Sequence, residues 1–201
     1  MKSVLISIRP KWVEKIASGK KTIEVRKTAP KEVPFKAYIY CTKGKTYLYR
    51  VDDDNNFELT NTLRPKTYEY VKDYNEQNGK VIGEFICDKV YDILPHNDGY
   101  KTNQYEMGWK YGEADCCLSF DELYSYLGDR NGYGWHIYDL KIYDEPKELS
   151  EFYRPCSYSG ICYSCNRFRP NGTPNDEPND FCDGEITRPP QSWQYVEELE
   201  K

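Results

Sequence analysis

The chain has 201 residues, of which 38% are hydrophobic and 30% are charged. That length is sufficient for one domain with a substantial core, or for one domain with an appendage. The charged fraction is high, but 15% aromatic residues exclude an intrinsically disordered chain. No apolar run approaches the length of a membrane span, and no small-residue cleavage site follows the short apolar segment at 3–8. We therefore expect a cytoplasmic protein that does not contact a membrane.

The charge is distributed unevenly along the chain. Residues 1–50 hold 13 Lys and Arg against 3 Asp and Glu, a net charge of +10, whereas the remainder holds 15 against 30, a net charge of −15. A basic segment of this kind is typical of polyanion binding. Two halves of opposite charge that meet at an internal interface explain the same asymmetry, and the sequence leaves both interpretations open.

Strands dominate the predicted elements, and they do not alternate regularly with helices. The predicted strands lie at residues 3–8, 22–26, 36–42, 45–51, 57–60, 80–93 and 133–143. The strand at 80–93 is expected to break at Gly83 or Asp88. Residues 61–80 and 95–115 are expected to be loops, the first with a short helix at 66–74.

Two helices are predicted. Pro10 fits the first position of one helix, and Gly19 fits its C-terminal end. Between them, one apolar stripe that should face the core is formed by Trp12, Val13, Ile16 and Ala17. The second helix begins at Ser119, which can form a capping box with Glu122, and it ends at Gly128. Few helices and many strands favour an α+β fold, a small mixed β-barrel with peripheral helices.

The composition changes near residue 150. Beyond it Cys, Pro, Asn and Gly cluster, so we divide the chain into a folded domain at 1–152 and an irregular extension at 153–201. Trp193 and Tyr195, near the end of the extension, either anchor the tail on the barrel or form part of a ligand cleft. The sequence does not choose between these two roles.

Four cysteines of the extension form a candidate metal site. Cys162 and Cys165 have the C-x2-C spacing that lets two sulfurs bind one ion, and Cys156 and Cys182 can complete a tetrahedron. A segment so poor in core residues is expected to need structural zinc to fold. Four free thiols, or a redox pair at Cys162 and Cys165, are the alternatives. The other cysteines are expected to be small buried hydrophobic residues (Cys41, Cys87, Cys116 and Cys117).

The segment SGKKTIEVRK carries the main candidate site. Side chains alternate along a strand, so Thr22, Glu24 and Arg26 share one face, behind Lys20 and Lys21 at the entrance of the strand. Arg26 could bind a phosphate or carbonyl, and Glu24 could accept a proton or hold Lys21 in place. A lysine in a partly dry site can act as a base. A solvated strand face with ordinary salt bridges has the same residue pattern.

Two further residues are candidates for ligand binding. Arg9 lies in the basic first segment, directly before the first helix. Trp109, in a glycine-bearing loop, could stack on a base, although packing of the loop explains it equally well. His136, one of only two histidines, is expected to be structural.

Three segments together resemble an ASCH domain of the PUA-like superfamily, most of all its phage and bacterial members: SIRPKWVEKIASGKKTIEVRK, GKVIGEFICDKV and GYGWHIYDLKIYDEPKEL. The resemblance covers about residues 1–150 and is most specific in a Gly-x-Lys-x-x-Glu-x-Arg run, here Gly19, Lys21, Glu24 and Arg26. It implies a PUA-like barrel of five or six strands. Relatives of this kind bind RNA or modified nucleobases, some are ribonucleases, and some are amidohydrolases that act on acylated cytidine.

The amidohydrolase relatives have a threonine at the position of Glu24, and a further glutamate from elsewhere, so this chain departs from their pattern. Three functions stay open. The first is binding of RNA or of a modified nucleobase or nucleotide in a cleft lined by the strand. The second is a metal-independent ribonuclease or nucleoside amidohydrolase with Lys21 and Glu24 as catalytic residues. The third is a zinc-stabilised protein-interaction module. The oligomeric state is not indicated by the sequence.

Overall fold

The strands form three sheets. The computed structural model describes residues 1–52, 54, 56–62, 75–96, 99–102, 115–155 and 184–199. The first sheet has the order β11-β7-β3-β1-β12, with bounds Tyr138–Lys147, Val81–Cys87, Phe35–Cys41, Lys2–Ile8 and Trp193–Val196. The second has the order β2-β10-β8-β9, with bounds Ile23–Arg26, Gly132–His136, Val90–His96 and Gly99–Thr102. The third has the order β5-β4-β6, with bounds Phe57–Thr60, Tyr47–Arg50 and Asn75–Glu76.

Both predicted helices are confirmed, and local chemistry explains their ends. Helix α1 (Pro10–Ala17) begins with its proline and is followed by Gly19, which has a φ of 72°. Helix α2 (Phe120–Leu127) begins at Ser119, where both hydrogen bonds of the capping box with Glu122 are present. A short 3-10 helix, η3, covers Leu149–Glu151. No helix in the described part of the chain is long and apolar enough to cross a membrane.

The two longest predicted strands each divide into two strands that belong to different sheets. The predicted strand at 80–93 breaks after Cys87 into β7 and β8, and the one at 133–143 breaks at Ile137 into β10 and β11. These two corners lie together, because the amide of His136 donates a hydrogen bond to the carbonyl of Lys89. Gly83 stays inside β7, where a side chain would collide with the backbone of the neighbouring β11.

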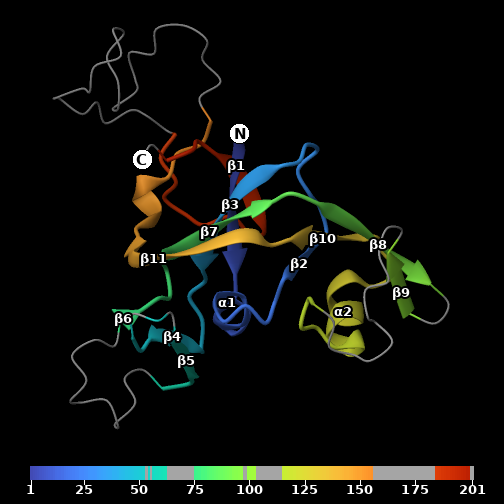
Figure 1. The fold of residues 1–201 in the computed structure, drawn as a ribbon, viewed down its shortest axis with the longest axis horizontal. Helices are drawn as coiled ribbons and strands as arrows, with labels where there is room; N and C mark the ends of the chain where they lie inside the picture. Colours follow the sequence, from blue (N-terminus) through green and yellow to red (C-terminus); the bar gives the residue numbers. More distant parts are fainter. Residues whose placement is uncertain are drawn as a thin grey trace, which may run out of the picture.

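Part of the predicted loop at 95–115 is a strand. Strand β8 continues to His96 and pairs antiparallel with β9 at 99–102. The predicted helix at 66–74 lies outside the described residues. Figure 1 shows the β8–β9 hairpin and α2 on one side of the molecule, the small sheet of β4, β5 and β6 on the other, and α1 between them.

The predicted α+β class with peripheral helices is confirmed, but the barrel is not. The strands that the structure describes form three separate sheets instead of one closed barrel. The chain passes from the first sheet to the second between β7 and β8, and back again between β10 and β11. The backbone hydrogen bonds between strands do not continue around these two corners. The core therefore lies between layers that meet at bent strands.

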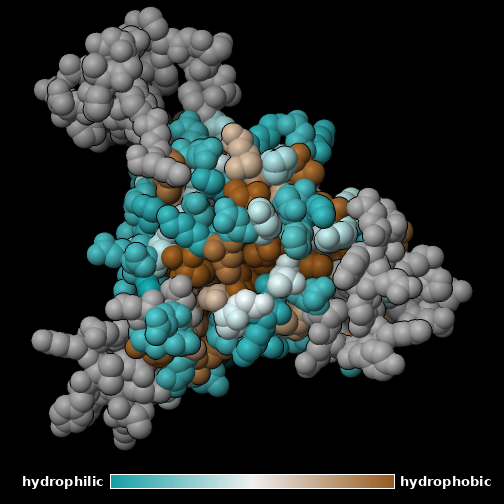
Figure 2. Space-filling model, viewed as in Figure 1, coloured by the Kyte–Doolittle hydropathy of each residue, from teal (hydrophilic) through white to brown (hydrophobic). Residues whose placement is uncertain are grey.

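The middle of the first sheet is buried on both faces, which explains why six of the seven residues of β1 and all seven of β3 are buried. Val4, Ile6 and Ile8 face the main core, which includes residues of α1 and Trp135. Leu5 faces a second cluster, to which the late residues Phe152, Ile186 and Val196 contribute. The last part of the predicted extension thus joins the domain, since β12 pairs antiparallel with β1. On the face in Figure 2, hydrophobic residues gather over the middle of the molecule and hydrophilic residues surround them.

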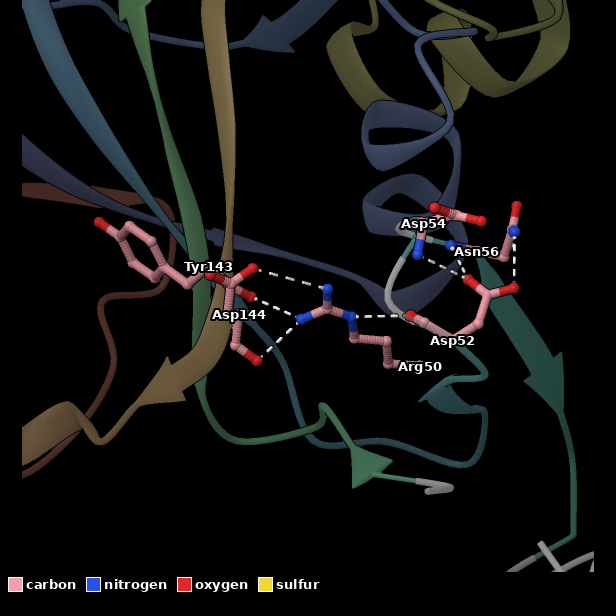
Figure 3. Close-up of polar contacts among 6 residues, drawn as sticks. All are labelled: Arg50, Asp52, Asp54, Asn56, Tyr143 and Asp144. Atoms are coloured by element: carbon pink, nitrogen blue, oxygen red, sulfur yellow. Dashed lines mark hydrogen bonds and ion pairs between the residues drawn. The ribbon is translucent and has the colours of Figure 1, made fainter. Parts of the chain in front are cut away.

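Arg50 attaches the small sheet to the first sheet (Figure 3). This arginine is only 7% exposed. Its Nη1 donates hydrogen bonds to the carbonyls of Tyr143 (2.9 Å) and Asp144 (2.8 Å) in β11, and its Nε donates to the carbonyl of Asp52 (3.0 Å). Three carbonyl oxygens are thus satisfied by one planar cation, which a lysine cannot reproduce.

We expect Arg50→Lys to lower the free energy of unfolding by about 1–3 kcal/mol, because part of a set of charge-assisted hydrogen bonds from a buried guanidinium to backbone carbonyls is lost. Urea unfolding of the full chain measures the change. Arg130→Lys, at an exposed position, is the matched control and should change stability by less than about 0.5 kcal/mol. Equal unfolding midpoints for both variants would show that Arg50 does not anchor the sheet.

Candidate functional site: a pocket on strand β2

A pocket of about 760 Å³ opens beside β2, between the two helices and the C-terminal segment. The floor is formed by Lys21, Glu24 and Arg26. The wall residues come from both helices, from two strand ends and from the C-terminal segment. They include Arg9 and Trp12 at α1, Asp121, Glu122, Ser125 and Tyr126 of α2, Ser7 and Thr42 at the strand ends, and Pro189, Pro190 and Gln191 near the C-terminus. The volume is in the range of small-molecule sites.

The floor is a row of charges with one carboxylate between two cations. The Nζ of Lys21 lies 3.3 Å from Oε2 of Glu24, and Nη2 of Arg26 lies 2.9 Å from Oε1 of the same carboxylate. Lys21 also donates a hydrogen bond to the carbonyl of Cys116 (2.6 Å), and Nη2 of Arg26 donates to the carbonyl of Ser7 (2.7 Å). The three charged residues are 2%, 5% and 7% exposed, in chain order.

Burial distinguishes this strand from a solvated one. All four residues of β2 are buried. Ile23 and Val25 pack into a cluster with Leu123 and Leu127 of α2. Glu24 and Arg26 alternate with them and line the pocket, which Val25 also reaches. The alternative interpretation, an ordinary solvated strand face, does not fit residues that are so little exposed.

Polar capacity remains in the floor. Oε2 of Glu24 and Nε of Arg26 are buried without a hydrogen-bond partner among the described residues. Oε2 is within ion-pair distance of Lys21, but the geometry falls short of a hydrogen bond. Buried charges are costly unless they are paired and fully hydrogen-bonded. The arrangement is thus suited to binding a polar group more than to packing alone.

The walls balance the charge of the floor. Three cations line the pocket, Arg9, Lys21 and Arg26, and so do three anions, Glu24, Asp121 and Glu122. The described lining of the pocket is therefore neutral overall, although residues 1–50 are strongly basic.

An ion pair connects the two helices at the rim of the pocket. Lys11 of α1 lies 2.8 Å from Oε1 of Glu122 in α2. The hydrogen bond from Lys11, together with the one from the backbone N–H of Ser119, lowers the pKa of the Glu122 carboxyl. Glu122 thus stays charged at neutral pH and serves two purposes, as the cap of α2 and as the partner of α1.

The structure separates the predicted site residues into three groups. Arg9, Lys21, Glu24 and Arg26 line the pocket, and Lys21 is at its floor rather than at its mouth. Lys20 is exposed and Thr22 is half-buried, and neither is among the lining residues. The remaining candidates lie outside the described residues: Trp109, Cys156, Cys162, Cys165 and Cys182.

Several lining residues were not predicted. Trp12 was expected to face the core, and it does pack against the core, but it also lines the pocket. The polar residues of α2 repeat at helical spacing, which indicates a polar stripe on one face of the helix. The pattern does not indicate that this stripe faces a pocket. The sequence does not indicate that Ser7 and the segment 189–191 line a pocket. They are far apart in the chain, and only the tertiary fold brings them together.

The remaining titratable groups of interest are structural. The Nδ1 of His136 lies 2.6 Å from Asp88, and this pair holds the corner between β7, β8 and β10. Cys41 and Cys87 are buried, and burial raises the pKa of each thiol to about 12. Within the described ranges, no three His, Cys, Asp or Glu side chains gather as a metal site.

We expect Glu24→Gln to lower the free energy of unfolding by about 3–5 kcal/mol, because the substitution leaves two buried cations without a counter-charge. Chemical denaturation of both proteins measures the loss. The control is Glu32→Gln, which removes the exposed ion pair with Lys2 and should cost at most about 1 kcal/mol. A loss at Glu24 no larger than that of the control would contradict a buried, unscreened charge row.

No protein-family model matches the sequence, and no curated protein matches it. Among solved structures the chain is similar to crystal structures of an ASCH protein from Zymomonas mobilis. A variant of that protein with a serine replaced by alanine has a TM-score of 0.51 at 16% identity, over 98% of this chain and 89% of that one. The unsubstituted protein has a TM-score of 0.46 at 16% identity, over the same shares of the two chains. The chain therefore has the fold of an ASCH domain.

Proposed function

We propose that the pocket binds a single nucleobase, either of a modified nucleoside or of an unpaired nucleotide in RNA. The observation that carries the proposal is the deeply buried floor, in which Glu24 holds Lys21 and Arg26 in fixed positions. The described lining around it has equal numbers of cations and anions. A floor of this kind offers both donors and acceptors to the edge of a base. Its rigidity favours one arrangement of those groups over others.

The contacts of the floor favour a base over a phosphate. Both cations already bind Glu24, and each also donates a hydrogen bond to a backbone carbonyl. Asp121 and Glu122 in the wall would repel a phosphate. Trp12 and Tyr126, which come from different helices, supply aromatic surface to the same pocket. Stacking on such rings and hydrogen bonding to base edges are the usual means of recognising unpaired bases.

We expect calorimetric titration with the four common ribonucleosides, their 5′-monophosphates and a set of modified nucleosides to find a ligand whose affinity changes little with salt. A phosphate-based mode would instead lose affinity steeply as salt rises. Tyr126→Leu should weaken binding by about 5- to 100-fold, since a stacking surface is lost.

The matched control for that titration is Tyr138→Leu, which changes an exposed tyrosine outside the pocket lining. It should bind as the wild type does. No binding by any nucleoside, or equal affinity of the Tyr126 and Tyr138 variants, would overturn the proposal.

Hydrolysis at the same site is the second candidate. The observation that favours it is the 3.3 Å contact between Nζ of Lys21 and the Glu24 carboxylate in the pocket floor, since the two groups could share an acid and base role. The same incubations, with EDTA and short RNA added, can be followed by mass spectrometry. Products that form with the wild type and not with Lys21→Ala would assign catalysis to this pair, as a metal-independent ribonuclease or nucleoside amidohydrolase.

We also propose that Cys156, Cys162, Cys165 and Cys182 hold one structural zinc ion. The proposal is supported by their spacing and by the polar composition between them. Reduced, full-length protein should contain about one equivalent of tightly held zinc by elemental analysis. Cys165→Ser should abolish zinc binding, whereas Cys41→Ser, at a buried cysteine of β3, should not. Less than about half an equivalent in the wild type would refute the site.

A further inference from the structure

The C-terminal segment crosses the pocket before it enters the first sheet. Pro189, Pro190 and Gln191 line one wall. Directly after them, β12 pairs antiparallel with β1, from Ile6 opposite Trp193 to Ser3 opposite Val196. Because β12 is a four-residue strand at the edge of the sheet, this wall is held by few backbone hydrogen bonds.

Ser7 connects this wall to the floor of the pocket. Its Oγ donates a hydrogen bond to the carbonyl of Pro190 (2.6 Å), and its backbone N–H donates to the carbonyl of Ser192 (2.9 Å). Its own carbonyl accepts the hydrogen bond from Nη2 of Arg26 (2.7 Å). Ser7 is 8% exposed, so these bonds are shielded from water. One residue of β1 thus contacts both sides of the site.

A second path runs through aromatic rings. Trp193 donates from Nε1 to Oγ1 of Thr28 (3.0 Å), in the loop that follows β2. Its ring lies 5.7 Å from that of Trp135, which stands opposite Glu24 in the β2–β10 ladder. The docked position of the C-terminal segment therefore depends on the same strand that carries the floor.

The far end of the segment is fastened separately. Glu198 lies 2.7 Å from Nζ of Lys36, and the amide of Leu199 donates to the hydroxyl of Tyr38 (3.0 Å). These contacts lie beyond β12, away from the pocket lining. They tether the chain end even when the part beside the pocket opens locally, so that local opening need not release the whole segment.

We propose that Ser7 is a positioning residue that couples the pocket floor to the C-terminal wall, so that a ligand on the floor and the docked segment 189–196 stabilise each other. The ligand part of this inference rests on the proposed function. The two hydrogen bonds use different groups of Ser7, its carbonyl and its Oγ, so a displacement of Arg26 reaches Pro190 through the position of this one residue. Coupling between ligand and segment must be equal in both directions.

The coupling can be measured without any ligand, by hydrogen–deuterium exchange of the full chain. Ser7→Ala should speed exchange in residues 192–196 by about 2- to 10-fold, the effect of one lost hydrogen bond. Ser3→Ala is the matched control: Ser3 is a buried serine of the same strand, also opposite β12, and its Oγ has no hydrogen-bond partner in the described part of the chain. Equal exchange in the two variants would overturn the role of Ser7.

A second variant tests the path from the floor. Arg26→Lys keeps the charge beside Glu24 but cannot keep the same fork of hydrogen bonds. It should speed exchange in 192–196 while exchange in β3, at 35–41, stays unchanged. In the Ser7→Ala background its effect on 192–196 should shrink. Exchange that speeds equally in both segments, or effects of the two variants that simply add, would overturn the path from the floor to the C-terminal wall.

The ligand arm uses whichever nucleoside binds in the titration. It should slow exchange in 192–196 of the wild type, and its affinity should fall in Ser7→Ala by the same factor of about 2 to 10. Binding that leaves exchange and the Ser7→Ala affinity unchanged would overturn the coupling and leave the proposed function intact. If no nucleoside binds, the proposed function fails, and the two ligand-free experiments still decide the coupling.

Discussion

A single carboxylate, that of Glu24, stands between two buried cations, and the rest of the site depends on that arrangement. Without it, Lys21 and Arg26 would be two like charges in a buried site, where water would not screen their repulsion and where each charge would carry its full cost of desolvation. With it, each cation is held in a fixed orientation. Lys21 donates a further hydrogen bond to the carbonyl of Cys116, and Arg26 donates one to the carbonyl of Ser7. The ion row thereby positions the loop before α2 and the strand β1 relative to β2.

This arrangement also explains how a basic segment makes a neutral pocket. The excess of Lys and Arg in residues 1–50 is a property of the sequence. The electrostatic interaction of these residues depends on which charges lie close to them in space, and several of those charges come from other parts of the chain. Glu122 of α2 pairs with Lys11, and Glu198 near the C-terminus pairs with Lys36. Of the two interpretations of the charge asymmetry, opposite halves meeting at internal interfaces matches these contacts.

Both the fold and the pocket also depend on the C-terminal segment. It covers one face of the first sheet through Ile186 and Val196, extends that sheet by β12, and supplies a wall of the pocket. Trp193 and Tyr195 lie together in the aromatic cluster and anchor the strand, and the residues just before them reach the pocket. The same few residues thus contribute to the stability of the fold and to the wall of the pocket. A substitution among them is therefore expected to change both the stability and the pocket.

Local rules were sufficient for much of this protein. The sequence by itself determined both helices, because Pro10, Ser119 with Glu122, and the glycines that follow are signals within one or two turns. It determined the alternation that puts Glu24 and Arg26 on one face of β2. The sequence offered Gly83 and Asp88 as places for a break in the strand at 80–93, and the tertiary structure chose Asp88. Only the tertiary structure decided that the chain changes sheets there and at residue 137, that α2 faces α1, and that Ser7 meets Pro190. These contacts join residues as much as 183 positions apart, and no local pattern encodes such a meeting.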